Sequence, residues 1–129
     1  MAEPRELNSF DDWVVAEYER TEGFTALVVL FEIGMLSLRP LRSTFLHVIG
    51  GEIDWAELSK LLAGAGVKWD GVALFPVSAE EGGPVPDSQA HLRLKELTDR
   101  IAENRMVVNE GHFFDPWGRR MKVEEAQAQ

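Results

Sequence analysis

Hydrophobic residues recur along this chain with two different periods, one typical of helices and the other of strands. Residues 54–66 have the helical period. Asp54 is placed as the N-cap and Glu57 stands three residues later, so each side chain can accept the other's unpaired backbone N–H. Gly64 or Gly66 then ends the helix. The apolar stripe expected to face the core consists of Trp55, Leu58, Leu62 and Ala65.

A second helix is predicted after residue 86. Asp87 or Ser88 is a suitable N-cap, and Asn104 can close the helix in the left-handed conformation. Its inward stripe consists of Ala90, Leu94, Leu97 and Ile101. The pattern therefore predicts two amphipathic helices, each with one apolar face to bury.

The other apolar segments are short and rich in β-branched residues, as strands are. Residues 25–33 form an almost continuous apolar run, which predicts a central strand covered on both faces. Pro40 is expected to break the chain, and residues 43–49 predict another strand after it. Residues 71–77 predict a further strand. Because Pro76 has no backbone N–H, the end of that strand is expected at an edge or outside the sheet.

Residues 12–20 fit either a strand or a helix. Read with period two, one face of a strand carries Val14, Ala16 and Tyr18. Read with the helical period, Ser9 is a possible N-cap, and the apolar stripe consists of Phe10, Val14, Tyr18 and Thr21. We favour the strand, because Val14 and Val15 are β-prone and residues 22–23 can turn into the next strand.

The end of the chain predicts a hairpin. The sequence Asp115-Pro116-Trp117-Gly118 places Asp first, Pro second and Gly fourth, as a type I turn with a glycine bulge prefers. Residues 106–109 and 120–123 are expected to be strands near this turn.

The predicted elements follow one another in the order β-β-β-α-β-α-β-β. They indicate a two-layer α+β fold, with a mixed, largely antiparallel sheet of five or six strands and two helices. The strand–helix–strand passages 43–77 and 71–109 can form local parallel pairs with right-handed crossovers. Residues 1–8 and 124–129 are polar and lack periodicity. They are expected to be a flexible N-terminal arm and a flexible C-terminal tail on a single domain of residues 9–123.

Composition and charge narrow the classes of function. The chain has 129 residues and no cysteine, which excludes disulfides, thiolate metal sites and cysteine nucleophiles. Its 13 basic and 22 acidic residues give a net charge of −9, which repels nucleic-acid phosphates and anionic membranes. No signal peptide is recognised at the N-terminus, and the apolar stretch 24–38 is too short to span a bilayer. We therefore expect a cytoplasmic protein that binds neither nucleic acid nor membrane.

The densest group of chemically active side chains consists of Glu110, His112 and Asp115. On a strand, residues two apart share a face, so a carboxylate and an imidazole would come together. Such a group could begin a divalent-metal site or an acid–base pair. The alternative is a polar face before the turn, in which Asp115 serves only as the first turn residue. Divalent metal is the one cofactor suggested, because phosphate-binding, dinucleotide and nucleophile-elbow motifs are missing from the sequence.

The other two histidines are weaker candidates for chemistry. His47 lies in an apolar strand and is expected to be a hydrogen-bonded core residue. His91 falls beside the stripe of the second helix, which predicts a boundary position.

Five residues are candidates for contact with a partner. Trp117 stands at the centre of a turn, where burial within its own domain is hardest, and an exposed aromatic there can anchor a partner. The alternative is that it folds back over the sheet. Arg119 and Arg120 beside it could dock a carboxylate, although a solvated face explains them more simply. Glu80 and Glu81, in the long loop before the second helix, favour a cation or a basic partner.

These features favour a small cytosolic interaction or self-association module without catalytic activity, whose partner is a second copy or another protein. The alternative is a small-molecule or divalent-metal-binding protein, including an enzyme, centred on Glu110, His112 and Asp115. The loops supply carboxylates but few bases, nucleophiles or oxyanion donors, so the balance lies against an enzyme.

Overall fold

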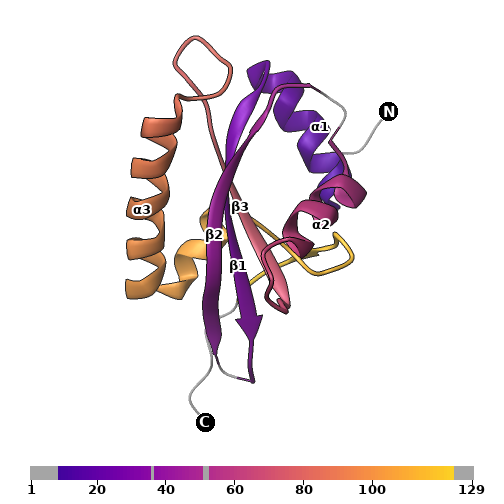
Figure 1. The fold of residues 1–129 in the computed structure, drawn as a ribbon, viewed down its shortest axis with the longest axis vertical. Coiled ribbons are helices and arrows are strands. Elements are labelled where there is room, and N and C mark those ends of the chain that lie inside the picture. Colours follow the sequence, from indigo (N-terminus) through magenta and orange to yellow (C-terminus); the bar gives the residue numbers. More distant parts are fainter. Residues whose placement is uncertain (1–8, 36, 51–52, 124–129) are drawn as a thin grey trace, which may run out of the picture.

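The computed structural model describes residues 9–35, 37–50 and 53–123, which form one five-stranded sheet with helices packed against it (Figure 1). The strand order is β2-β1-β3-β4-β5, and every neighbouring pair is antiparallel. The helices are α1 (Phe10–Thr21), α2 (Trp55–Ala63), α3 (Asp87–Glu103) and the 3-10 helix η1 (Arg105–Glu110). The strands are β1 (Phe24–Ile33), β2 (Leu38–Val48), β3 (Gly71–Val77), β4 (His112–Phe114) and β5 (Arg120–Met121).

The predicted α+β class, with a largely antiparallel sheet of five strands, is confirmed. The observed order of helices and strands differs from the predicted one at the first element, which is a helix, and by the addition of η1. The local parallel pairs suggested for residues 43–77 and 71–109 do not form, because β3 runs antiparallel to both of its neighbours, β1 and β4. The predicted arm, residues 1–8, and tail, residues 124–129, lie outside the described residues.

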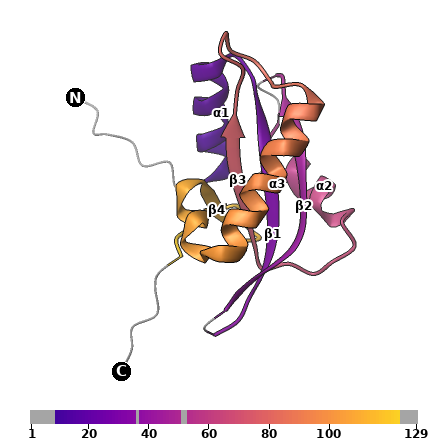
Figure 2. The ribbon, with the colours of Figure 1, turned by 90° about the vertical axis from the view of Figure 1, so that its left-hand side faces the viewer.

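Both faces of the sheet are covered. Helices α1 and α2 lie on one side and α3 on the other, as the two perpendicular views show (Figures 1 and 2). Alternate residues of β1 belong to two separate cores: Ala26, Val28 and Leu30 face α1 and α2, whereas Leu27, Val29 and Phe31 face α3 and η1. This confirms the prediction that β1 is buried on both faces. It also gives the fold three layers, where the sequence predicts two.

Residues 12–20 are a helix, so the strand that we favoured there is wrong and the alternative is correct. Ser9 is the N-cap, and its Oγ accepts the backbone N–H of Asp12 at 3.3 Å. The helical period explains the outcome, because it brings Phe10, Trp13 and Val14 onto one buried face. The Trp13 ring then packs edge-on against Phe24 of β1, with 5.8 Å between ring centroids. A strand would have turned Trp13 and Val14 to opposite sides.

Strand β2 runs through Pro40, where the sequence predicts a break. β2 is an edge strand and pairs only with β1. A proline, which has no backbone N–H, can therefore be accommodated there without breaking hydrogen bonds to a second neighbouring strand. The pairing with β1 shifts at this point: Leu30 stands opposite Arg42 and Phe31 opposite Pro40, which leaves Leu41 as a bulge. Pro76 behaves as expected, because β4 pairs only with Val72–Leu74 of β3 and has ended before Pro76.

The two predicted helices are confirmed as α2 and α3. Asp54 caps α2 by accepting the N–H of Glu57 at 2.9 Å, and Gly64 closes the helix. The predicted stripes are buried or partly buried in both helices. Two details of α3 differ from expectation. Pro86 occupies the N-cap position without a side-chain bond, and Asn104 has an extended backbone with φ of −153°.

The C-terminal hairpin forms, but its first strand lies later than predicted. Residues 106–109 belong to η1, because Asn104 accepts the N–H of Met106 and starts a tight helix that buries Val107 and Val108. The hairpin consists of the short strands β4 and β5. The turn between them is as predicted, with Gly118 at a φ of +80° and its N–H bonded to the Asp115 carbonyl at 2.9 Å.

The position of Trp13 predicts a large stability effect. Trp13 is 2% exposed, so Trp13→Ala should lower the free energy of unfolding by about 3–5 kcal/mol. Trp117 is 73% exposed, so Trp117→Ala should change it by less than about 0.5 kcal/mol and serves as the matched control. Urea unfolding of both variants, at concentrations low enough to keep the chain monomeric, measures the two values. Equal losses would contradict the assignment of Trp13 to the core.

Candidate functional site

The terminal hairpin is organised by one carboxylate. Oδ1 of Asp115 accepts the backbone N–H groups of Trp117 and Arg119, at 2.9 and 3.0 Å. Oδ2 accepts Nε of Arg119 at 2.9 Å. The side chain of Asp115 thereby satisfies two backbone donors of the turn and one guanidinium. These bonds fix the shape of the turn.

The turn is also fastened to the body of the domain. The N–H of Phe10 donates to the carbonyl of Gly118 at 2.9 Å, and Nε1 of Trp55 donates to the carbonyl of Pro116 at 3.0 Å. Two features require glycine at position 118. Its φ is positive, and a Cβ there would lie 2.9 Å from the Trp55 ring. The hairpin is therefore bonded to both α1 and the start of α2.

This fixed turn presents an aromatic ring and an exposed cation, and a second, half-buried cation follows in β5. Trp117 is 73% exposed at the tip, and the Arg119 guanidinium lies over its ring at 5.3 Å from the centroid. The Arg120 guanidinium lies over the ring of Phe114 at 5.0 Å. We call Trp117, Arg119 and Arg120 the hairpin surface. Of the two possibilities for Trp117 left open by the sequence, the ring does not fold back over the sheet.

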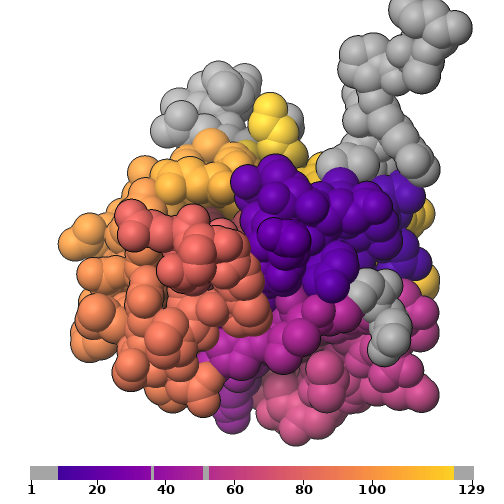
Figure 3. Space-filling model, turned by 90° about the horizontal axis from the view of Figure 1, so that it is seen from above, coloured from indigo at the N-terminus to yellow at the C-terminus, as the bar shows by residue number. Residues whose placement is uncertain are grey.

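The loop 78–86 carries the two candidate acidic residues, Glu80 and Glu81, which are both exposed. The loop is closed on itself by a bond from the Ala79 N–H to the Gly83 carbonyl at 2.9 Å. The N–H of Gly83 also donates to the Thr21 carbonyl at 3.0 Å, which ties the loop to the end of α1. The view from above shows the loop between α3 and α1 (Figure 3).

The three residues of the possible metal site have separate tasks. Both carboxylate oxygens of Glu110 accept Nη2 of Arg100, at 2.8 and 2.9 Å. Asp115 accepts backbone N–H groups of its own turn, which is the alternative role predicted for it. Within the described ranges, no three His, Asp or Glu side chains are grouped so that they could hold a metal ion. The structure therefore does not bring Glu110, His112 and Asp115 together as ligands.

His112 is stacked on Trp13, with 4.5 Å between ring centroids and 28° between planes. Burial, and secondarily the positive charge of Arg120, lower the pKa of His112 from 6.5 to about 4. The imidazole is therefore neutral at pH 7. Its Nδ1 and Nε1 of Trp13 are buried and have no hydrogen-bond partner among the described residues. The ring packs flat against Trp13.

His47 links three parts of the fold. Its Nδ1 lies 2.8 Å from Oγ1 of Thr25, and its Nε2 lies 2.7 Å from Oδ1 of Asp87 at the start of α3. Oγ1 of Thr25 also accepts the N–H of Val85 at 3.0 Å, so the hydroxyl hydrogen is available to Nδ1 and Nε2 donates to Asp87. The predicted hydrogen bonding of His47 is confirmed, but its side chain is 27% exposed on the edge strand, so it is not the core residue that the sequence predicted.

A hydroxyl, an imidazole and a carboxylate in series are the components of a nucleophilic triad. Thr25, however, is 0% exposed and its oxygen is already bonded to the Val85 amide, so no substrate can reach it. These hydrogen bonds connect the loop 78–86 and the start of α3 to β1 and β2. No local sequence pattern predicts this arrangement, because Thr25, His47 and Asp87 are far apart in the chain.

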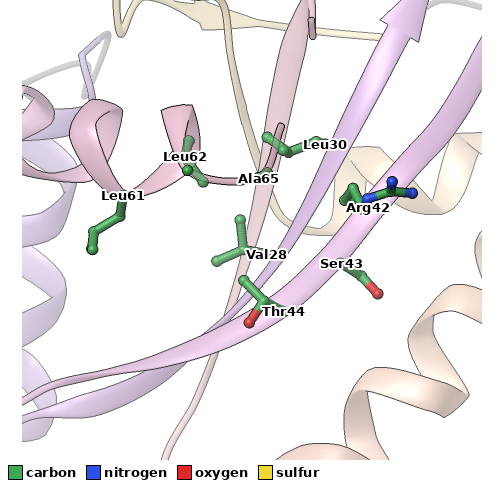
Figure 4. Close-up of a pocket in the computed structure, with 9 residues that line it drawn as sticks. Val28, Leu30, Arg42, Ser43, Thr44, Leu61, Leu62 and Ala65 are labelled. Carbon is green, nitrogen blue, oxygen red and sulfur yellow. The ribbon is translucent and has the colours of Figure 1, made fainter. Parts of the chain in front are cut away.

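A groove of about 320 Å³ opens between α2 and β2 (Figure 4). Its floor is apolar, and it is bordered by Arg42 and Thr44 from β2 and by Leu61 from α2. Leu61 is 60% exposed. The apolar floor consists of Val28, Leu30, Leu62 and Ala65. Sequence reasoning missed this groove; the one available signal was that Leu61 is apolar but lies outside the inward stripe of its helix.

No protein-family model, curated protein or solved structure matches this chain, so its functional interpretation depends on its own geometry. None of the described helices combines the length and the apolar composition needed to cross a membrane.

The environment of His112 predicts a pH dependence of stability. The unfolded chain binds a proton at this residue near pH 6.5 and the folded chain only near pH 4. The stability associated with neutral His112 is therefore complete above pH 6.5 and is lost as the pH falls towards 4. The expected loss is about 1–2 kcal/mol after allowance for solvent screening of this partly exposed ring.

The variant His112→Phe isolates this contribution, because it keeps a flat ring against Trp13 and removes the titrating nitrogens. We expect the variant to be at least as stable as the wild type at pH 7, and to lose less stability between pH 6.5 and 4. Urea unfolding at several pH values measures the difference, with His91→Gln at an exposed histidine as the control. Parallel curves for the wild type and His112→Phe would disprove the role assigned to His112.

Proposed function

We propose that this protein is a non-catalytic interaction module that self-associates through the hairpin surface, with Trp117 as the anchor. The observation that supports this most directly is the 73% exposure of Trp117 on a turn held by Asp115. A turn that is already fixed loses little further entropy when a partner binds. The cysteine-free composition suits the reducing cytosol, where we expect the module to act.

The residue types of the hairpin surface are those that dominate binding energies. Tryptophan and arginine are enriched among interface residues whose removal costs most affinity. Covering most of a tryptophan ring removes enough apolar surface from water to contribute roughly 3–4 kcal/mol before entropic costs. Arg119 already lies against the Trp117 ring, so a partner would meet a preformed aromatic and cationic pair.

Charge complementarity supports a second copy as the partner. Two chains of charge −9 repel each other overall, so their association requires a local match of opposite charges. Arg119 supplies the basic part, because its side chain is 71% exposed although Asp115 accepts its Nε, and the exposed Glu80 and Glu81 supply the acidic part. The loop with these glutamates is at the top of the molecule, well above the hairpin turn in both ribbon views (Figures 1 and 2). A two-fold dimer could therefore form the basic–acidic contact twice.

The state of the reactive side chains supports a function without catalysis. Thr25, whose hydroxyl is bonded to the imidazole of His47, is fully buried. Glu110 and Asp115 are paired with arginines. His112 is neutral and stacked on Trp13. These groups stabilise local structure instead of converging on a common cavity.

Sedimentation velocity or native mass spectrometry over a range of concentrations tests the proposal. The wild type should form a dimer. Trp117→Ala should raise the dissociation constant of the dimer roughly 1,000-fold, because the two-fold dimer loses two anchors at about 2 kcal/mol each. The double variant Glu80→Lys, Glu81→Lys should also weaken the dimer, because it replaces the acidic part of the proposed contact with a basic one.

The matched control is Leu92→Ala. Leu92 is 58% exposed on α3, so the variant removes a comparable exposed apolar side chain away from the hairpin. Its dimer should be unchanged. A wild-type chain that stays monomeric at high micromolar concentration, or a dimer indifferent to Trp117→Ala, would reject self-association through this surface.

A further inference from the structure

The outer edge of β2 is a second exposed surface, distinct from the terminal hairpin. β2 stands at the end of the strand order, so the outward-pointing N–H and C=O groups of its backbone have no strand partner among the described residues. Near its start, Pro40 and the bulge at Leu41 interrupt this row. From Arg42 to Val48 the pairing with β1 is regular. This stretch can therefore accept an additional antiparallel or parallel strand.

The groove described above lies beside this same stretch, on its α2 side (Figure 4). In an added strand, every second side chain would point towards α2. The floor formed by Val28, Leu30 and Leu62 offers apolar contact to such a side chain, and Leu61 offers more at the rim. Backbone bonding along the edge and one apolar pocket beside it are the two components of peptide recognition by strand addition.

The charges of β2 indicate which peptides would fit. The strand contains Arg39, Arg42 and His47 and no carboxylate, although the chain as a whole has a charge of −9. Arg39 is paired with Glu32 at 2.8 Å, and His47 with Asp87. Arg42 borders the groove, and its guanidinium bonds only to the adjacent Leu41 carbonyl among the described residues, at 3.3 Å. An acidic side chain would complete the pairing of Arg42.

We infer that the edge of β2 and the adjoining groove bind an extended peptide segment that is acidic and carries alternating apolar residues. The segment adds to the sheet along residues 42–48, places one apolar side chain in the groove and pairs a carboxylate with Arg42. A second copy of this chain is a poorer occupant. Pairing two β2 strands would give neither Arg42 a carboxylate partner on the other strand, because β2 contains none.

The probe for this site is a capped synthetic peptide, Asp-Glu-Val-Thr-Leu-Thr-Val-Asp-Glu, carrying a fluorescent label. Fluorescence anisotropy with the full chain should show saturable binding with a dissociation constant in the micromolar range. In two-dimensional NMR spectra, the amide signals of residues 42–48 should shift most. A peptide with lysines in place of the acidic residues should bind at least about tenfold more weakly, because it repels Arg42. A peptide with prolines in place of the threonines should also bind more weakly, because proline cannot donate to the ladder.

Two exposed positions of the protein separate the parts of the site. Arg42→Glu should weaken peptide binding by about tenfold or more through loss of the charge pair and repulsion. Leu61→Glu should weaken it similarly, because it places a negative charge at the apolar rim while keeping a residue that suits a helix. The matched controls are Arg93→Glu and Leu92→Glu, which make the same changes at exposed positions of α3. Both control variants should bind like the wild type.

Several results would overturn this inference. Absence of saturable binding to the wild type up to millimolar peptide is one. Another is equal binding to the wild type, Arg42→Glu and Leu61→Glu, or NMR shifts confined to the hairpin surface. A wild-type dimer that dissociates on Arg42→Glu would show that a second copy occupies the β2 edge, and the peptide assignment would then be wrong.

Discussion

Burial of β1 on both faces is the constraint from which the rest of the arrangement follows. Each residue of the run Phe24–Phe31 is buried, so apolar layers are needed on each side of the strand. Two amphipathic helices on the same side would leave Leu27, Val29 and Phe31 exposed to water. The chain meets the requirement by placing α1 and α2 on one face and α3 with η1 on the other. Because β2 and β3 flank β1, the short strands β4 and β5 pair on the far side of β3, at the end of the sheet.

The sequence was most informative where a structure is determined by neighbouring residues. Asp54 caps α2 through a bond to Glu57 three residues away, and Asp115 organises its own turn. Such interactions leave a readable spacing because both partners lie within one turn of the backbone. The same turn geometry made an exposed Trp117 one of two possibilities, and the structure, with the ring 73% exposed, decides between them. The sequence therefore indicated the residues of the hairpin surface but neither the orientation of the Trp117 ring nor a partner.

The features that the sequence did not predict depend on partners distant in the chain. Residues 12–20 have acceptable patterns for a strand and for a helix, and the contacts of Trp13 with Phe24 and Phe114 decide between them. His112 lies between Glu110 and Asp115 in the sequence. In the structure, however, its ring stacks on Trp13, and the two carboxylates form ion pairs with Arg100 and Arg119. The groove combines residues from β1, β2 and α2, so no local motif could indicate it.

The two proposed surfaces lie towards opposite ends of the strand order. The outer edge of β2 and the β4–β5 hairpin stand at opposite ends of the strand order, with β1 and β3 between them. The two surfaces also differ in what they offer: the hairpin surface presents side chains on a fixed turn, whereas β2 presents unpaired backbone beside an apolar groove. Occupation of one surface therefore need not cover the other, although α2 is bonded to the hairpin through Trp55 and borders the groove with Leu61. We propose that each partner binds at its own end of the strand order.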